Sequence, residues 1–253
     1  MTRLPSLRGP LSPAAAWSSD SSQLDLWRVR LSSPRPEELS ILSGDERDRA
    51  GRLHARGRSA FAASRLALRC VLGRYVSRAP QSLVFEYEAH GRPALKGAAG
   101  LDFNLSHSGD FAVIAVAERA RAGVDLQKFD RARDHLQIAG RFFASAENDV
   151  LARLEGEAQV KAFYRTWACK EAYVKALGTS IAVLPSTAFC FDFTDAEVRL
   201  VQTAWTESFE DWQFGLLDAP DDYAGALCWS GVPSGFRAFD FEPGRSLDTL
   251  AAN

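Results

Sequence analysis

A glutamate and a lysine lie one helical turn apart in the middle of an apolar stripe. Across residues 157–177 the apolar side chains recur at intervals of three and four positions, which is typical of an amphipathic helix. Glu171 follows Trp167 by four positions, so we expect its carboxylate on the apolar face, where a charge must be neutralised, paired or bound to a metal. Lys175 falls on nearly the same face, and Lys170 directly precedes Glu171. The pair is therefore either an ordinary i,i+4 ion pair or part of a site for a metal or a phosphate.

A second carboxylate interrupts a segment that otherwise has the character of a short strand. In that segment Val124 and Leu126 share one face, and Asp125 and Gln127 share the other. An isolated aspartate here would be a solvated strand edge or a turn cap, because aspartate is a poor strand former. Paired in space with Glu171, it would instead supply oxygen ligands to Mg²⁺, which takes one or two carboxylates together with water and phosphate oxygens.

A histidine and an arginine stand in segments that the sequence predicts to be turns. His107 lies within residues 106–110, whose Ser, Gly and Asp content favours a hairpin turn. A turn histidine is usually a hydrogen-bonded side chain, but beside serines and lysines it can also help to hold a phosphate. Arg92, within Gly-Arg-Pro (91–93), is on its own a charged residue of a plain turn.

The elements that must position these residues follow the order strand, helices, strands twice, dividing near residue 119. The first set has a strand at 24–31, helices within 37–75, a strand at 83–87 and a hairpin of 103–105 with 111–117. The second set has a strand at 123–127, helices at 135–143, 146–154 and 157–177, and strands at 188–193, 199–203, 212–217, 223–229 and 236–241. We therefore predict an α+β fold of two similar halves, 23–119 and 120–253, preceded by an irregular arm at 1–22.

Composition excludes several classes of protein. The 253 residues are 46% hydrophobic and 25% charged with a net charge of −2, which argues against a dedicated nucleic-acid binder. No apolar run reaches the ~18 residues of a membrane span, and the prolines at positions 5, 10 and 13 interrupt any signal-peptide core. The four cysteines, at 70, 169, 190 and 228, are too dispersed for a zinc site and read as buried thiols of a cytoplasmic protein.

Four motifs, taken in order, resemble those of the surfactin-type 4′-phosphopantetheinyl transferases. They are Gly-Arg-Pro (91–93), Phe-Asn-Leu-Ser-His-Ser (103–108), Gly-Val-Asp-Leu (123–126) and Trp-x-x-Lys-Glu-Ala-x-x-Lys-x-x-Gly (167–178), and Arg-Phe-Phe-x-x-x-Glu (141–147) accompanies them. Members of this family move phosphopantetheine from coenzyme A to a serine of an apo carrier protein. The resemblance implies two α+β halves in a pseudo-twofold arrangement, with the active site in the cleft between them.

The resemblance also implies roles for the residues around the reacting phosphate. Asp125 and Glu171 look like the magnesium ligands, and Lys175 looks like the lysine that contacts the coenzyme A pyrophosphate. Lys170 is a neighbouring motif lysine. Glu147 is similar to a glutamate that helps to deprotonate the attacking serine, although it could equally cap the helix that starts near residue 146.

At the nucleotide end, Ser106 and His107 look like the pair that contacts coenzyme A, with His107 near the 3′-phosphate. Arg92 and Pro93 resemble the segment that borders the adenine. For the upstream arginine that meets the 3′-phosphate, Arg58 is our first candidate, followed by Arg56 and Arg65.

One position departs from the family pattern. Many relatives carry an acidic residue two places after the motif aspartate, whereas this chain has Gln127. Glutamine can coordinate through its carbonyl oxygen or orient a metal-bound water, but it brings no charge. We therefore expect a magnesium site of two carboxylates, with more water ligands and a weaker metal affinity than a site of three.

The sequence thus predicts a magnesium-dependent transferase that acts on coenzyme A and an apo acyl or peptidyl carrier protein and releases 3′,5′-ADP. A monomer is sufficient, because both halves lie in one chain. Two alternatives remain open at this point. The chain could be a non-catalytic module that binds coenzyme A or the carrier protein, or an unrelated magnesium phosphohydrolase that releases inorganic phosphate.

Overall fold

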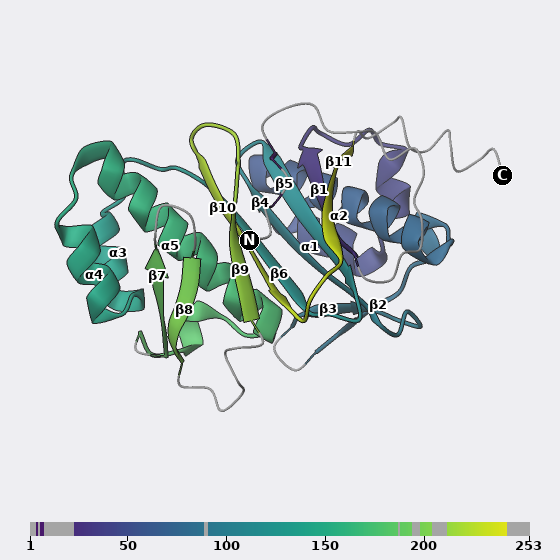
Figure 1. Ribbon diagram of the computed structural model, residues 1–253. Coiled ribbons are helices and arrows are strands. Elements are labelled where there is room, and N and C mark those ends of the chain that lie inside the picture. The colour runs from purple at the N-terminus through teal and green to yellow at the C-terminus, as the bar shows by residue number, and fades with distance from the viewer. Residues whose placement is uncertain are drawn as a thin grey trace.

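The computed structural model (Figure 1) shows an α+β chain in which two halves repeat one order of elements. It describes residues 4, 6–7, 23–88, 91–186, 188–193, 198–203 and 212–241. Most of the predicted arm at 1–22 therefore lies outside the described residues. Within them, no helix is both long and apolar enough to cross a membrane.

The first half builds an antiparallel sheet and covers it with helices. Its elements are β1 (Gln23–Arg30), η1 (Glu38–Ile41), α1 (Gly44–Gly51), α2 (Ala55–Val76), η2 (Pro80–Ser82), β2 (Phe85–Tyr87), β3 (Pro93–Leu95), β4 (Leu101–Ser108) and β5 (Phe111–Glu118). The strands pair in the order β1-β5-β4, and β2 pairs with β3 in a separate two-stranded sheet. α2 packs its apolar side against the main sheet, and the two together form one core.

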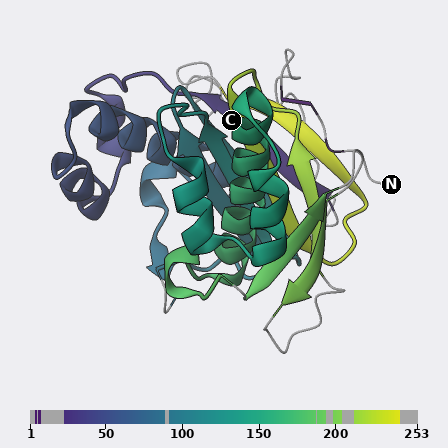
Figure 2. The same ribbon diagram turned by 90° about the vertical axis from the view of Figure 1, so that its left-hand side faces the viewer.

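The second half repeats this plan. Its elements are β6 (Ala122–Lys128), α3 (His135–Phe142), α4 (Ser145–Ala152), α5 (Gly156–Leu177), η3 (Ile181–Val183), β7 (Phe189–Phe193), β8 (Val198–Thr203), β9 (Trp212–Leu217) and β10 (Tyr223–Ser230). The order β6-β10-β9 copies β1-β5-β4, β7 pairs with β8 as β2 does with β3, and α2 and α5 have 22 residues each. The predicted α+β fold of two similar halves is confirmed. Figure 2 shows α3, α4 and α5 standing together in front of the strands.

The C-terminal strand departs from the predicted division of the chain. β11 (Gly235–Phe241) follows the second half in sequence, yet it pairs in parallel with β1 in the first sheet. Two ion pairs accompany this pairing, Arg28 with Asp240 and Arg237 with Asp25, both at 2.7 Å. The sheet of the first half therefore contains residues 235–241 in addition to 23–118.

The two sheets meet along a line of polar side chains, which we call the polar seam. Side chains at alternate positions of β4 accept hydrogen bonds from backbone N–H groups at alternate positions of β6. The pairs are Asp102 with Ala122 (2.8 Å), Asn104 with Val124 (3.1 Å), Ser106 with Leu126 (3.2 Å) and Ser108 with Lys128 (2.9 Å). The constant offset of 20 residues shows that the two strands run in the same direction along the seam.

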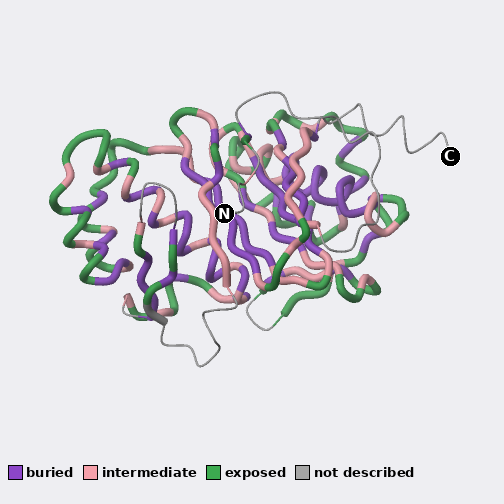
Figure 3. The backbone as a smooth tube through the Cα atoms, viewed as in Figure 1, coloured by how far each residue is buried: buried purple, intermediate pink, exposed green. Residues whose placement is uncertain are grey.

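An apolar core lies beside the seam and also joins the two halves. Side chains of β1 and β5, including Leu26 and Val113, pack there against Val124 and Leu126 of β6 and Leu227 of β10. Figure 3 shows the resulting continuous buried region along the central strands, with exposure concentrated on the outer sides of the helices. The four cysteines are buried and unpaired, as the sequence predicts.

The hairpin that carries His107 is tighter than predicted. β4 continues to Ser108, so Ser106 and His107 are strand residues, and the turn itself contains only Gly109 and Asp110. Strand alternation points Ser106 inward, where it is buried, and His107 outward, where it is exposed. The predicted turn was therefore wrong at these two positions, since Ser106 pairs with Val113 and His107 with Ala112 of β5.

The seam predicts a measurable loss of stability when one of its buried acceptors is removed. Asn104 is 6% exposed, so Asn104→Ala leaves the Val124 N–H without its partner in a place that water reaches poorly. We expect urea denaturation to show a loss of about 1–3 kcal/mol. Ser108→Ala is the matched control, since the half-buried Ser108 lies at the open end of the seam and water can replace it. Equal losses for the two variants would contradict the account.

Candidate functional site

Asp125 is the buried centre of the site. Its side chain is only 1% exposed, and three neighbours donate hydrogen bonds to it. Ser106 Oγ lies 2.8 Å and Lys175 Nζ 2.5 Å from Oδ1, and Gln127 Nε2 lies 2.8 Å from Oδ2. A buried carboxylate is costly unless it is hydrogen-bonded and its charge is balanced, and these three contacts supply both.

A glycine on β6 allows α5 to bring its functional residues to Asp125. A Cβ atom on Gly123 would lie 2.0 Å from the carbonyl oxygen of Ala172 and 2.6 Å from the backbone nitrogen of Ala176. Only a residue without a side chain permits this approach of strand and helix. Because Glu171 and Lys175 are one turn apart on α5, they then face Asp125 together.

The carboxylate of Glu171 has a different environment from that of Asp125. It is half-buried, and none of the residues that the structure describes donates a hydrogen bond to it. Burial raises the pKa of Glu171, and the negative charge of Asp125 raises this pKa further, while Lys175 lowers it only in part. Two carboxylates that approach each other with incomplete neutralisation suit a divalent cation, which would relieve both effects.

The site offers few oxygen ligands for a metal, and their type is compatible with magnesium. No cluster of three or more His, Cys, Asp or Glu side chains that could hold a metal occurs in the described part of the chain. Asp125 and Glu171 are the two carboxylates that interact through their charges here, and the amide of Gln127 donates a hydrogen bond to Asp125. Two carboxylates fit the habits of Mg²⁺, which keeps several waters and takes phosphate oxygens from a substrate.

His107 and Lys175 mark the outer side of the site. Lys175 Nζ lies 3.1 Å from Ser106 Oγ, and its side chain is 26% exposed. His107 is exposed at its outer side, but desolvation by the surrounding protein lowers the pKa of its imidazole, and the positive charge of Lys175 lowers it further. An anion placed beside the two side chains would be attracted by Lys175 and could accept a hydrogen bond from His107.

This combination of fold and site has clear relatives. The profile of the 4′-phosphopantetheinyl transferase superfamily matches residues 121–228, and the profile of the 4′-phosphopantetheinyl transferase N-terminal region matches residues 33–119. The chain is 36% identical over 193 residues to the 4′-phosphopantetheinyl transferase HetI of Nostoc sp., covering 74% of this chain and 81% of the relative. The chain belongs to the 4′-phosphopantetheinyl transferase superfamily.

Two further comparisons describe the breadth of the transferase superfamily around this chain. The 4′-phosphopantetheinyl transferase psf-1 of Bacillus pumilus is 36% identical over 102 residues, which cover 40% of this chain and 42% of that protein. Among solved structures, a holo-(acyl-carrier-protein) synthase from Bacillus anthracis in complex with coenzyme A (3′,5′-ADP) aligns with a TM-score of 0.37 and 21% identity. That alignment covers 44% of this chain and 94% of the synthase.

The structure brings together most of the residues that the transferase motifs single out. Asp125, Gln127, Ser106 and Lys175 form one hydrogen-bonded group. The pKa of Glu171 is affected by the charges of Asp125 and Lys175, and the pKa of His107 by the charge of Lys175. Sequence reasoning missed the supporting role of Asp102, Asn104 and Ser108 in the seam. The signal was present, because a polar side chain at every second position is the pattern of one strand face.

Glu147 and Lys170 lie apart from this group and bind each other. Lys170 Nζ is 2.8 Å from Glu147 Oε2 and 3.0 Å from the carbonyl oxygen of Phe189, with the lysine 1% exposed. The two carboxylate oxygens of Glu147 also accept the backbone N–H groups of Ala144 and Phe191. With both oxygens engaged, Glu147 joins α4, α5 and β7, and it forms part of the wall of a separate apolar groove of about 390 Å³.

The predicted nucleotide-binding arginines occupy three different environments. Arg65 is buried and donates to Glu46 at 2.6 Å, so it belongs to the interior of the first half. Arg58 is exposed and donates to the backbone carbonyls of Gly51 and Leu53. Arg56 is exposed and stands near the His107 hairpin, where its charge contributes, after the hydrogen bond and charge of Lys128, to lowering the pKa of Asp110.

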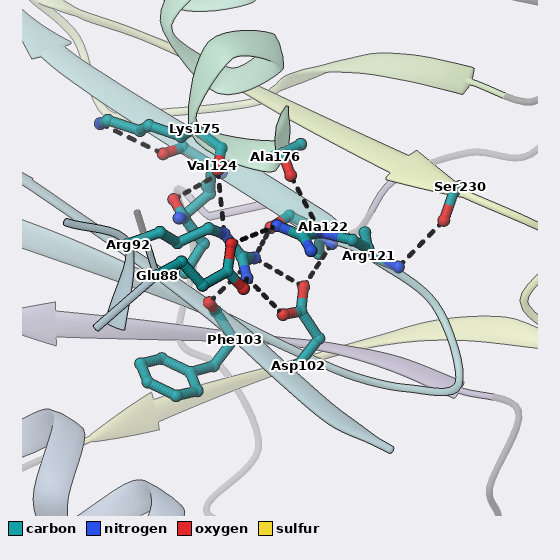
Figure 4. Close-up of polar contacts among 11 residues, drawn as sticks. Glu88, Arg92, Asp102, Phe103, Arg121, Ala122, Val124, Lys175, Ala176 and Ser230 are labelled. Carbon is teal, nitrogen blue, oxygen red and sulfur yellow. Dashed lines mark hydrogen bonds and ion pairs between the residues drawn. The ribbon is translucent and has the colours of Figure 1, made fainter. Parts of the chain in front are cut away.

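Arg92 and Pro93 are split between two environments. Pro93 begins β3 and pairs with Tyr87 of β2. Arg92 is 6% exposed, and its guanidinium turns into the protein, as Figure 4 shows. Within the described residues, its guanidinium donates to the carboxylate of Asp102 and to the backbone carbonyls of Lys175, Phe103 and Ala122.

The Glu147–Lys170 pair predicts a structural and not a chemical phenotype. Lys170→Met leaves Glu147 buried without its counter-charge, and we expect a loss of about 3–5 kcal/mol in urea denaturation. Adding Glu147→Gln should restore part of that stability, because the remaining buried group is then neutral. A stable Lys170→Met protein with strongly reduced activity would contradict this assignment and indicate that Lys170 contacts the substrate.

Proposed function

We propose that the protein transfers the 4′-phosphopantetheine group of coenzyme A to a serine hydroxyl of an apo acyl or peptidyl carrier protein, with Mg²⁺ as its metal. The observation that carries the proposal is the group at the junction of the two sheets. There a buried aspartate, a partly neutralised glutamate and a half-buried lysine converge from β6 and α5. Because the chain belongs to the 4′-phosphopantetheinyl transferase superfamily, we assign this group to the transfer of phosphopantetheine.

The chemistry requires positioning and charge neutralisation. The serine oxygen attacks the phosphorus that carries the pantetheine group, and the bond from this phosphorus to the bridging oxygen of the pyrophosphate breaks. The products are phosphopantetheinyl-serine and 3′,5′-ADP, and the serine proton passes to a base. In this proposal the ammonium of Lys175, which donates to Ser106, supplies a point charge to the pyrophosphate oxygens. His107, which is close enough to Lys175 for the lysine charge to lower its pKa, donates a hydrogen bond to the nucleotide phosphate.

The metal would be held by Asp125 and Glu171. When bound there, Mg²⁺ supplies charge stabilisation for the phosphate oxygens. Ser106 and Gln127 keep the Asp125 carboxylate in one orientation by hydrogen bonds at 2.8 Å each. We propose Glu147 as a support of β7 and Lys170 rather than as the base for the serine, since its oxygens already accept three protein donors.

Within the superfamily we propose the surfactin-type group, a monomer and a cytoplasmic location. Support for the group comes from the four ordered motifs and from two complete α+β halves in one chain. The same duplication makes one chain sufficient for the site. Four buried, unpaired cysteines suit a reducing compartment.

Intact mass spectrometry tests the reaction directly. An apo carrier protein incubated with this protein, coenzyme A and Mg²⁺ should gain one phosphopantetheine group, and EDTA should abolish the gain. Glu171→Gln removes one metal-binding charge at constant size, and we expect the rate to fall by roughly 100-fold or more. Glu157→Ala is the matched control, because Glu157 is an exposed glutamate at the other end of α5.

Other outcomes would point elsewhere. Binding of coenzyme A without any mass gain across acyl and peptidyl carriers would favour a non-catalytic binding module. Release of inorganic phosphate without a carrier would favour a phosphohydrolase. Equal activity of Glu171→Gln and wild type would remove Glu171 from the site.

The glutamine beside the metal position gives a separate prediction. Gln127→Glu adds a carboxylate next to Asp125, so we expect half-maximal turnover at a lower Mg²⁺ concentration. Calorimetric titration with Mn²⁺ should show tighter binding by the same variant in the absence of carrier protein. An unchanged metal dependence in both measurements would contradict the two-carboxylate interpretation.

A further inference from the structure

Arg92 occupies an unusual position for a residue of a surface turn. It lies between β2 and β3, directly after Gly91, whose φ of +83° lets the chain turn back on itself. Its guanidinium crosses from this turn into the junction between the two sheets, where it lies among residues of β4, β6 and α5 (Figure 4). Burying an arginine is costly unless oxygen atoms of the protein accept hydrogen bonds from its guanidinium and a carboxylate balances its charge.

The guanidinium binds the first acceptor of the polar seam. Nη1 and Nη2 donate to the two oxygens of Asp102 at 2.7 Å each, in the bidentate geometry that is strongest for this pair. Nη2 also contacts the carbonyl oxygen of Ala122 at 3.0 Å, and the N–H of Ala122 in turn donates to Asp102. Arg92 therefore fixes the end of the seam where β6 begins.

The Nε–H group of Arg92 binds α5, the helix that carries Lys175. Arg92 Nε donates to the backbone carbonyl oxygen of Lys175 at 3.0 Å. This carbonyl lies in the last turn of α5, where it also accepts the backbone N–H of Gly178 at 3.2 Å and where a positive charge is favourable. The side chain of the same Lys175 binds Asp125 and Ser106. The backbone and the side chain of Lys175 are thus held from the first half and from the seam, respectively.

We infer that Arg92 is a positioning residue that sets Lys175 in the transferase site, an inference that rests on the proposed function. Arg92 acts through the Lys175 carbonyl and the Asp102 end of the seam, and not by touching the nucleotide. Its effect on the reaction is therefore transmitted by Lys175. If the Lys175 ammonium is absent, the position of its backbone matters little to phosphate binding.

The chain offers a matched control on the same helix end. Arg121 Nε donates to the carbonyl of Ala176 at 3.1 Å, and its guanidinium pairs with Glu88, which also lies 3.7 Å from Arg92. Its side chain is 42% exposed. Arg121 therefore caps α5 as Arg92 does, but its side chain holds a different carbonyl and lies at the surface.

A double-mutant cycle separates positioning from a purely structural role. Arg92→Lys keeps the charge but loses the fork that reaches Asp102 and Lys175 together. We expect Arg92→Lys to lower kcat/KM for phosphopantetheine transfer by on the order of 10- to 100-fold in the wild-type background. In the Lys175→Ala background the same change should cost less than about 2-fold, because interacting residues are non-additive. Arg121→Lys should lower kcat/KM by less than about 3-fold in either background.

The same cycle on the dissociation constant of coenzyme A, measured by calorimetry, gives a readout that needs no turnover. The loss of affinity caused by Arg92→Lys should again shrink when Lys175 is absent. Equal losses in both backgrounds would overturn the inference and indicate a contact with the substrate or a general effect on the fold. Failure of the proposed function would look different, since the wild-type protein would then transfer nothing while the calorimetric cycle still reports on Arg92.

A second variant guards against misfolding. Arg92→Gln with Asp102→Asn replaces the buried ion pair by two neutral amides, which avoids an unpaired charge. If its melting temperature stays within a few degrees of wild type, its cycle with Lys175→Ala should show the same non-additivity. A well-folded double variant with full activity would contradict the positioning role.

Discussion

The edge of β6 that faces β4 presents a backbone N–H at every second residue, and each needs a partner because this edge is buried between two sheets. β4 meets the need with side chains instead of a second row of backbone groups. The polar seam therefore joins two duplicated halves without fusing their sheets, and it sets the register of β6 against β4. Everything that converges on Asp125 depends on that register, since a shift of one residue would turn Asp125 to the opposite face.

The seam also links the stability of the fold to the chemistry of the site. Ser106 accepts the N–H of Leu126 as a seam residue and donates to Asp125 as a site residue. Gly123 lets α5 approach β6 at the same level, which brings Glu171 and Lys175 to the buried carboxylate. Asp125 accepts hydrogen bonds from three side chains in the interior, whereas Glu171 has a raised pKa and no hydrogen-bond donor among the described residues. The protein therefore supplies hydrogen-bond donors to the carboxylate of Asp125, whereas the described residues supply none to that of Glu171.

Local patterns in the sequence predicted α5, the strand of Asp125 and the repeated order of elements, because periodicity and strand alternation depend on near neighbours. They did not predict the seam. Serine, glycine and aspartate favour turns, so Ser106 and His107 were assigned to one, although pairing with Val113 and Ala112 of β5 keeps them in a strand. Arg92 read as an exposed turn residue, because the Lys175 carbonyl that binds it lies 83 positions away. The pairing of β11 with β1 spans the chain, and no local pattern records it.

The central claim is that Asp125 and Glu171, brought together by the seam, form the metal site next to Lys175. The most direct test is a crystal structure of the protein with coenzyme A and Mn²⁺, read by the anomalous signal of the metal. The account predicts a single strong peak in contact with both carboxylates, with Lys175 Nζ moved from Asp125 to a pyrophosphate oxygen. A peak at Glu147, or coenzyme A bound with its pyrophosphate away from Lys175, would contradict it.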